Sequence, residues 1–370
     1  MQTRIPCVFM RGGTSRGPYF HASDLPDDVP TRDAVLLRAM GSPDVRQIDG
    51  IGGADPLTSK VAILSKSSRP GIDVDYLFAQ VKVDSAVVDT SPNCGNIISG
   101  VGPFAVEEGL VEAQDGETTV RIFNVNTSVP TEAIVQTPGG QVTYDGDCAI
   151  DGVPGTAAPV KLNFLNGEGS KTGKLFPTGR MIDVIDGMEV TCLDYCMPIV
   201  FLDARSMGKT GYESWDDLDN DKAFFDRMLA MRMKAGEMMG FGDVTDSVVP
   251  KVVILAPPKN GGTVTARYFM PWKTHKAYAV TGSLCTGVCV ALEGTVGYPL
   301  ADLPDGNPKP MEIEHPTGRL GIEMDVSGDP MNPKISRAAV LRTCRRLFEG
   351  SVLIPPSIWS GKQPVRQAAE

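Results

Sequence analysis

Apolar positions in this chain fall mainly into short runs of β-branched and aromatic residues, separated by glycine, proline and polar residues. Runs of about four to eight such residues, bounded by turn formers, are typical of β-strands. The pattern therefore predicts a fold rich in short strands and turns. The predicted strands cover residues 5–10, 18–20, 61–64, 74–83, 120–125, 182–184, 199–202, 252–255, 264–269 and 311–326, the last divided by a turn at 315–318.

Helical periodicity is less common. Segments 32–40 and 222–239 are predicted helices, the second with an apolar stripe (Phe224, Met228, Met231 and Met238) that we interpret as core. Segments 97–109 and 284–293 carry almost no charge before their last turn, so each helix is expected to be buried on all sides. Pro103 should remove one hydrogen bond and kink the first of them. Two buried helices among short strands predict an α+β fold.

The sequences that lead into the two buried helices are related. Residues 94–101 align without a gap on residues 281–288, with Gly95 matched by Gly282 but Cys94 matched by Thr281. We interpret this as an internal duplication with a boundary at the Asp-Gly pair near 183–188. The predicted halves are residues 1–185, with Lys60 and Cys94, and residues 186–370, with His275 and Thr281–Ser283, the C-terminal tail being free to return to the first half.

Composition and charge favour a globular protein and argue against nucleic-acid-binding and membrane-spanning classes. A chain of 370 residues with 42% hydrophobic and 22% charged residues is ordinary for a globular protein with two cores. The net charge of −10, without a basic stripe, argues against a nucleic-acid partner. The longest uncharged stretch, 277–292, is too short for a membrane span. Eight scattered cysteines and no secretory signal predict a reduced, cytoplasmic protein.

Cys94 is the first candidate for chemistry. It lies among proline, asparagine and glycine at a predicted helix start, where backbone N–H groups and the helix dipole can hold an anion and favour a thiolate. A buried structural cysteine is the common alternative, but such neighbours make a poor core. The neighbouring candidates for substrate binding are Asn93, Gly95 and Asn96, and their counterparts in the second half are Thr281, Gly282 and Ser283.

Lys60 and a glycine-rich segment near the N-terminus are further candidates. Lys60 follows the glycine-rich turn 49–53 and enters an apolar strand. A lysine at a strand entry is usually solvated, but partial removal from water would favour the neutral amine, which can act as a general base. Within residues 11–17, Arg11, Thr14 and Ser15 offer donors suited to carboxylates, with glycines that allow close backbone approach.

Other familiar sites fit poorly. Residues 13–17 match G-x-S-x-G, but a strand follows where a nucleophile elbow needs a helix. His275, six residues before Thr281, is a candidate ligand, but three scattered histidines form no cluster. The cysteine pairs 192/196 and 285/289 lack zinc-site spacing, and the aspartates at 217–221 lack the glycine of a calcium loop. No metal site is predicted.

Four motifs together resemble those of the PrpF family, whose fold is that of diaminopimelate epimerase. They are residues 10–17, 49–53, 58–60 and 93–96, and the likeness extends over about residues 3–359. Segments 40–44, 47–49 and 261–264 resemble the 4-oxalomesaconate enzymes of the family. The resemblance implies two pseudo-symmetric domains, each with strands around a central buried helix, an active site in the cleft between them, no cofactor, no metal, and a homodimer.

The resemblance also implies a mechanism. The family's lysine and cysteine fall on Lys60 and Cys94, whereas the second base of the related two-cysteine epimerases falls on Thr281, whose hydroxyl is too weak an acid or base. This broken symmetry favours an isomerase over an epimerase. We expect a proton and double-bond shift in an unsaturated tricarboxylate, 4-oxalomesaconate, during protocatechuate and gallate breakdown. The alternatives are a 2-methylaconitate or aconitate isomerase and a non-catalytic tricarboxylate-binding protein.

Overall fold

The computed structural model describes residues 2–91, 94–164 and 167–361, and the chain divides into two compact units. Unit 1 comprises the chain up to Leu162 together with the segment from Arg342 onward, and unit 2 comprises Asn163–Leu341. The Asp-Gly pair expected at the boundary lies inside unit 2. It forms the turn between β9 (Asp183–Ile185) and β10 (Met188–Asp194), with positive φ at Asp186 and Gly187, which is hairpin chemistry rather than a linker.

Unit 1 contains three antiparallel hairpins joined by parallel pairings. Strand β2 pairs in parallel with β3, and β4 pairs in parallel with β6. On the other side β1 pairs antiparallel with β16 (Asn332–Ile354), which begins in unit 2. The remaining strands are β1 (Thr3–Gly12), β2 (Ser15–His21), β3 (Lys60–Lys66), β4 (Val74–Val81), β5 (Val88–Asp89), β6 (Gly116–Asn124), β7 (Val129–Thr137) and β8 (Pro159–Phe164).

Unit 2 repeats this order of pairings. Its hairpins β10–β11, β12–β13 and β14–β15 are joined by the parallel pairs β11–β12 and β13–β14. The same alternation of antiparallel and parallel neighbours in both units confirms the predicted pseudo-symmetry of the fold. The strands are β11 (Pro198–Asp203), β12 (Lys251–Ala256), β13 (Val264–Phe269), β14 (Lys309–His315) and β15 (Gly318–Asp329).

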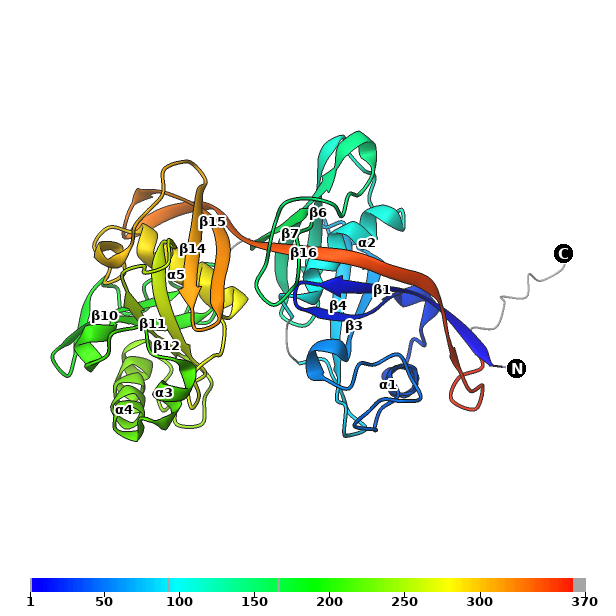
Figure 1. The fold of residues 1–370 in the computed structure, drawn as a ribbon, viewed down its shortest axis with the longest axis horizontal. Coiled ribbons are helices and arrows are strands. Elements are labelled where there is room, and N and C mark those ends of the chain that lie inside the picture. Colours follow the sequence, from blue (N-terminus) through cyan, green and yellow to red (C-terminus); the bar gives the residue numbers. More distant parts are fainter. Residues whose placement is uncertain (1, 92–93, 165–166, 362–370) are drawn as a thin grey trace. The chain divides into compact units, whose positions relative to one another are not determined.

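Each unit surrounds one buried helix with strands (Figure 1). In unit 1 the 3₁₀ turn η3 (Ile97–Gly100) packs against β1, β2 and β3, and α2 (Val101–Glu107) packs against β6 and β7. In unit 2, α5 (Val280–Ala291) packs against β10, β11 and β15. Pro103 was predicted to kink the buried helix of unit 1. The α-helix begins only at Val101, so Pro103 lies in its first turn, where a missing N–H costs little.

The other helices lie outside this central position. Helix α1 (Val29–Met40) shares a core cluster with β1, β3 and β4 in unit 1, and α4 (Lys222–Met238) shares one with β10, β11 and β12 in unit 2. Three members of the predicted α4 stripe are buried, but Met238 is 36% exposed and Met239 packs in its place. The short helices are η1 (Ala22–Asp24), η2 (Pro56–Thr58), η4 (Pro138–Gly140), η5 (Ala204–Met207), α3 (Trp215–Asn220) and η6 (Tyr298–Leu300).

All eight cysteines are free thiols. Within the ranges that the structure describes, no helix combines the length and apolar character that crossing a bilayer requires.

Glu314 in β14 anchors a loop of unit 2 through a buried carboxylate. Its oxygens accept hydrogen bonds from the backbone N–H groups of Lys259 (2.9 Å), Asn260 and Gly262 (2.9 Å) and from the hydroxyl of Thr265 (2.6 Å). Burial alone would raise the pKa of this carboxyl, but the four donors outweigh it, and the pKa lies below its ordinary value of 4.5.

We expect Glu314→Gln to lower the free energy of unfolding by about 1–3 kcal/mol at pH 7, because an amide cannot accept all four bonds. A depressed carboxyl pKa stabilises the fold above the unfolded-state value, and this contribution is lost as the pH falls through the folded-state value. Urea unfolding at pH 7 and at about pH 3 should therefore show a difference between wild type and variant that shrinks in acid. An equal difference at both pH values would contradict this role.

Candidate functional site

The β1–β2 hairpin touches both segments that carry the candidate catalytic residues. A Cβ atom at Gly12 would lie 2.7 Å from the carbonyl oxygen of Asn96, two residues after Cys94. A Cβ atom at Gly17 would overlap the carbonyl group of Lys60. Only glycine permits such close backbone approach. The glycines of the 11–17 motif therefore fix the backbone of Lys60 and the turn after Cys94 against one hairpin.

Lys60 is the first residue of β3, and it is buried rather than solvated, with 9% of the residue exposed. Its Nζ donates to Oε1 of Gln80 at 2.7 Å and lies 5.0 Å from the centre of the Phe78 ring. Both partners are neutral and stand on β4, where residues two apart share a face. Within the described part of the chain, no carboxylate lies within ion-pairing distance of Nζ.

Cys94 lies in the turn before η3 and is 7% exposed. The N–H of Ile98 donates to the Cys94 carbonyl oxygen at 3.3 Å. The side chain of Asn126 bonds both to the backbone of Phe78 on β4 and to the carbonyl of Thr90. The segment leading to Cys94 is thus tied to the strand that holds the partners of Lys60.

Of the three substrate-binding candidates beside Cys94, the structure describes Gly95 and Asn96. Gly95 and Asn96 are half-buried, and Asn96 Nδ2 donates to Thr14 Oγ1 at 3.0 Å, which joins the turn to the β1–β2 hairpin. Asn93 lies outside the described residues. The predicted regular helix start after Cys94 is a 3₁₀ turn instead, because η3 precedes α2.

Ser15 and Arg11 lie on the same hairpin. Ser15 is 1% exposed, and its Oγ has no hydrogen-bond partner among the described residues. Since buried hydroxyls are nearly always paired, Ser15 stays a candidate for substrate binding. Arg11 Nη1 donates to the carbonyls of Gly13 and Thr343 and to the Thr343 hydroxyl, and burial lowers the Arg11 pKa. Because β2 begins at Ser15, the segment is strand–turn–strand, which is not a nucleophile elbow.

In unit 2, His275 is half-buried just before α5. Its Nδ1 accepts the N–H of Ala277 at 3.0 Å, so the proton of the neutral ring sits on Nε2 and can be donated. Burial lowers the pKa of His275, the bond from Ala277 opposes this, and the nearby charge of Lys251 lowers it further. His275 is therefore suited to bind a carboxylate as a neutral donor.

The junction 281–283 forms the first turn of α5, which begins at Val280. Thr281 is half-buried, and Gly282 and Ser283 are buried. The Ser283 hydroxyl donates to the Val280 carbonyl at 2.8 Å, so its proton is used within the helix.

Sequence reasoning missed the partners of Lys60. Tyr76, Phe78 and Gln80 alternate along β4, and this spacing could have placed them on one face. It also missed that Lys251, the first residue of β12, occupies the position in unit 2 that Lys60 occupies in unit 1. Lys251 is half-buried, and burial, with a smaller contribution from the charge of Arg232, lowers its pKa to about 8.

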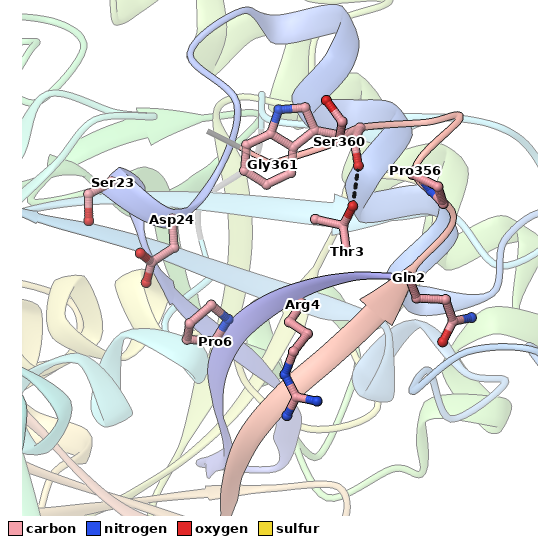
Figure 2. Close-up of a pocket in the computed structure, with 10 residues that line it drawn as sticks. Gln2, Thr3, Arg4, Pro6, Ser23, Asp24, Pro356, Ser360 and Gly361 are labelled. Carbon is pink, nitrogen blue, oxygen red and sulfur yellow. Dashed lines mark hydrogen bonds between the residues drawn. The ribbon is translucent and has the colours of Figure 1, made fainter. Parts of the chain in front are cut away.

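A surface hollow of unit 1 lies where the first strand meets the C-terminal segment (Figure 2). Its lining includes Arg4, Asp24 and Pro356, and Thr3 Oγ1 donates to the carbonyl of Trp359 there at 2.6 Å. It contains none of the candidate residues. In the ranges that the structure describes, no three His, Cys, Asp or Glu side chains gather as metal ligands.

Comparison with known proteins gives close relatives. The family described as PrpF protein matches residues 2–355. The protein YbhH of Escherichia coli (strain K12) is 51% identical over 352 residues, which are 95% of this chain and 99% of that protein. The (4E)-oxalomesaconate Delta-isomerase of Novosphingobium sp. (strain KA1) is 50% identical, covering 94% and 97%. The 4-oxalomesaconate tautomerase of Pseudomonas putida is 48% identical, covering 98% and 99%.

Solved structures of related proteins are similar to this chain over most of its length. A crystal structure of methylitaconate-delta-isomerase matches with a TM-score of 0.90 and 37% identity, over 99% of this chain and all of that one. A hydroxyproline epimerase from Agrobacterium vitis matches with a TM-score of 0.50 and 10% identity, covering 96% and 92%. At that identity the likeness shows the fold alone, which is that of the predicted epimerase-like class.

Proposed function

The chain belongs to the PrpF family and is an isomerase, and from this premise we propose that it moves a proton and a double bond within an unsaturated tricarboxylate, 4-oxalomesaconate. Two relatives that are about half identical over nearly their whole length are named for that substrate. The observation that carries the proposal is Lys60, a lysine buried against an amide and an aromatic ring, with no carboxylate of the described residues within ion-pairing distance.

We assign the first proton transfer to Lys60. Its neutral amine takes a proton from a substrate carbon acidified by the adjacent unsaturated carbonyl system, and the C–H electron pair becomes part of a dienolate. The groups that contact Nζ are a neutral amide and a ring, and no carboxylate of the described residues lies within ion-pairing distance of it. This absence of a counter-ion supports its role as the base.

We assign the second proton transfer to Cys94. Its thiol gives a proton to the far carbon of the dienolate, a new C–H bond forms, and the double bond has moved. Proton exchange with water then returns the ammonium of Lys60 to the amine and the thiolate of Cys94 to the thiol. The net reaction transfers one proton and needs no oxidant or reductant.

The substrate carboxylates need donors. In unit 1 the unpartnered hydroxyl of Ser15 and the donors of Thr14 and Arg11 are proposed ligands. In unit 2 His275 and Thr281 remain the candidate carboxylate ligands. Donors fixed in place before reaction stabilise the negative charge of a dienolate more effectively than water does.

A substrate panel tests this proposal. Purified protein is given 4-oxalomesaconate, 2-methylaconitate and cis-aconitate, and turnover is followed by ultraviolet absorbance and by NMR of the products. We expect the largest kcat/KM with 4-oxalomesaconate. Faster turnover of either aconitate would replace the substrate assignment, and tight binding of all three without turnover would contradict the isomerase mechanism.

A further inference from the structure

We propose that Gln80 is the positioning residue of Lys60, an acceptor that fixes the Nζ atom in place while contributing no negative charge. This inference rests on the proposed role of Lys60 as a base. It concerns a residue two strand positions from Phe78 on β4, directly opposite Lys60 in the β3–β4 pairing.

The orientation of the Gln80 amide is determined by its partners. Nε2 donates to the carbonyls of Pro56 at 3.0 Å and Ser59 at 2.8 Å, and Oε1 accepts from Lys60 at 2.7 Å. The opposite orientation would place an NH₂ group against the lysine donor and an oxygen against two carbonyl oxygens. The acceptor oxygen of Gln80 must therefore face Lys60.

Ser59, which accepts a hydrogen bond from Gln80, is fixed in place by further hydrogen bonds. Ser59 Oγ donates to the Val81 carbonyl at 2.8 Å, and Gln47 Nε2 donates to Ser59 Oγ at 2.7 Å. Ser59 and Gln47 are both buried. These bonds join the entry to β3 with the end of β4, so the three contacts of Gln80 fix Lys60 Nζ relative to the backbone.

The charged groups around Lys60 explain why an uncharged acceptor matters at this position. The carboxylates nearest in sequence and register have other hydrogen-bond partners: Asp89 of β5, which pairs with Gln80, accepts from Ser91, and Asp55 accepts from the N–H of Leu57 at the start of η2. Arg16 lies on β2, which pairs in parallel with β3. Gln80 thus orients Lys60 without adding a negative charge. A glutamate at this position would orient Lys60 too, but it would also stabilise the ammonium form.

Unit 2 supplies a natural contrast. Lys251 stands at the same position of its strand as Lys60, and since Val252 pairs with Phe269, Lys251 comes level with Met270. A methionine thioether is only a weak acceptor. At this register position the unit that carries Cys94 has a strong acceptor, and the unit where Thr281 replaces Cys94 has a methionine, as expected if the acceptor serves the proton transfer.

Gln80→Glu tests the charge argument. A carboxylate beside the amine would stabilise the ammonium form, so the rising limb of the kcat/KM profile should move to higher pH by about one unit or more, a loss of about tenfold on that limb. Gln80 also lines a surface hollow of about 430 Å³, through which the second carboxylate oxygen can reach water. The matched control is Gln136→Glu on β7, whose profile should not move.

Gln80→Met tests the positioning argument, because it keeps the length of the side chain and removes the acceptor. We expect kcat to fall about tenfold or more with a smaller change in KM, and the thermal midpoint to stay close to wild type. The proposal is overturned if folded Gln80→Glu keeps the wild-type profile. It is also overturned if folded Gln80→Met keeps the wild-type kcat. If Gln80→Glu fails to fold, the kcat of Gln80→Met alone tests the proposal.

The role of Lys60 and the role of Gln80 can be contradicted separately. An active Lys60→Met variant would contradict the proposed function. An inactive Lys60→Met variant together with an unmoved Gln80→Glu profile would contradict the role of Gln80 alone.

Discussion

Replacing Lys60 by methionine should lower kcat by about 10²–10⁴-fold, the range that a positioned acid or base contributes. Methionine retains an unbranched apolar side chain and removes the nitrogen that lies over the Phe78 ring and donates to Gln80. Since one hydrogen bond is lost and no cavity of side-chain size is opened, the fold should persist. Steady-state turnover of 4-oxalomesaconate measures the first effect, and thermal unfolding measures the second.

The control for this variant lies on the same strand. Lys66 is the last residue of β3 and is exposed, so Lys66→Met makes the same chemical change away from the candidate site. Its kcat should equal that of wild type. A Lys60→Met protein that keeps more than about a tenth of wild-type kcat would show that another group removes the proton.

Replacing Cys94 by alanine should have an effect of the same order, about 10²–10⁴-fold on kcat, because the dienolate then has no positioned acid. Cys94→Ser should be nearly as slow, since a serine hydroxyl is a far weaker acid than a thiol. Both variants should fold, because the residue lies in a turn and its sulfur has no hydrogen-bond partner among the described residues.

A second thiol provides the comparison. Cys7 is buried on β1, and burial raises the pKa of its thiol, which makes it inert. Cys7→Ala should therefore keep wild-type kcat while losing some stability through the small cavity it leaves. If Cys94→Ala turned over substrate as fast as Cys7→Ala, the proposed acid would be wrong.

Much of the architecture follows from local pattern. The apolar runs near Val61, Val252 and Val264 became strands, and the two uncharged helices became the buried centres of the two units, since a helix without a polar face needs cover on every side. Strands β5, β7, β8, β10 and β16 were not predicted. Glutamate and glutamine interrupt the apolar positions of β7, and arginine and glutamate recur along β16.

The site was only partly accessible from sequence. Cys94 and Lys60 could be selected because turn formers and a glycine-rich segment surround them, and that selection remains a prediction. Gln80 could not be selected, because its relation to Lys60 exists only through the β3–β4 register. The boundary between the two units could not be predicted for a similar reason. An Asp-Gly pair suits a hairpin turn and a linker equally well, and only the pairing of β9 with β10 shows that this pair forms a hairpin turn.

The central claim is that Lys60 removes a carbon-bound proton from 4-oxalomesaconate. NMR of the substrate and product pools in D₂O measures this directly, with wild type, Lys60→Met and Cys94→Ala compared at equal concentration. Wild type should place deuterium at the carbon that gains hydrogen, and Cys94→Ala should still exchange the substrate proton while forming little product. Lys60→Met should exchange none. Exchange by Lys60→Met at the wild-type rate would contradict the claim.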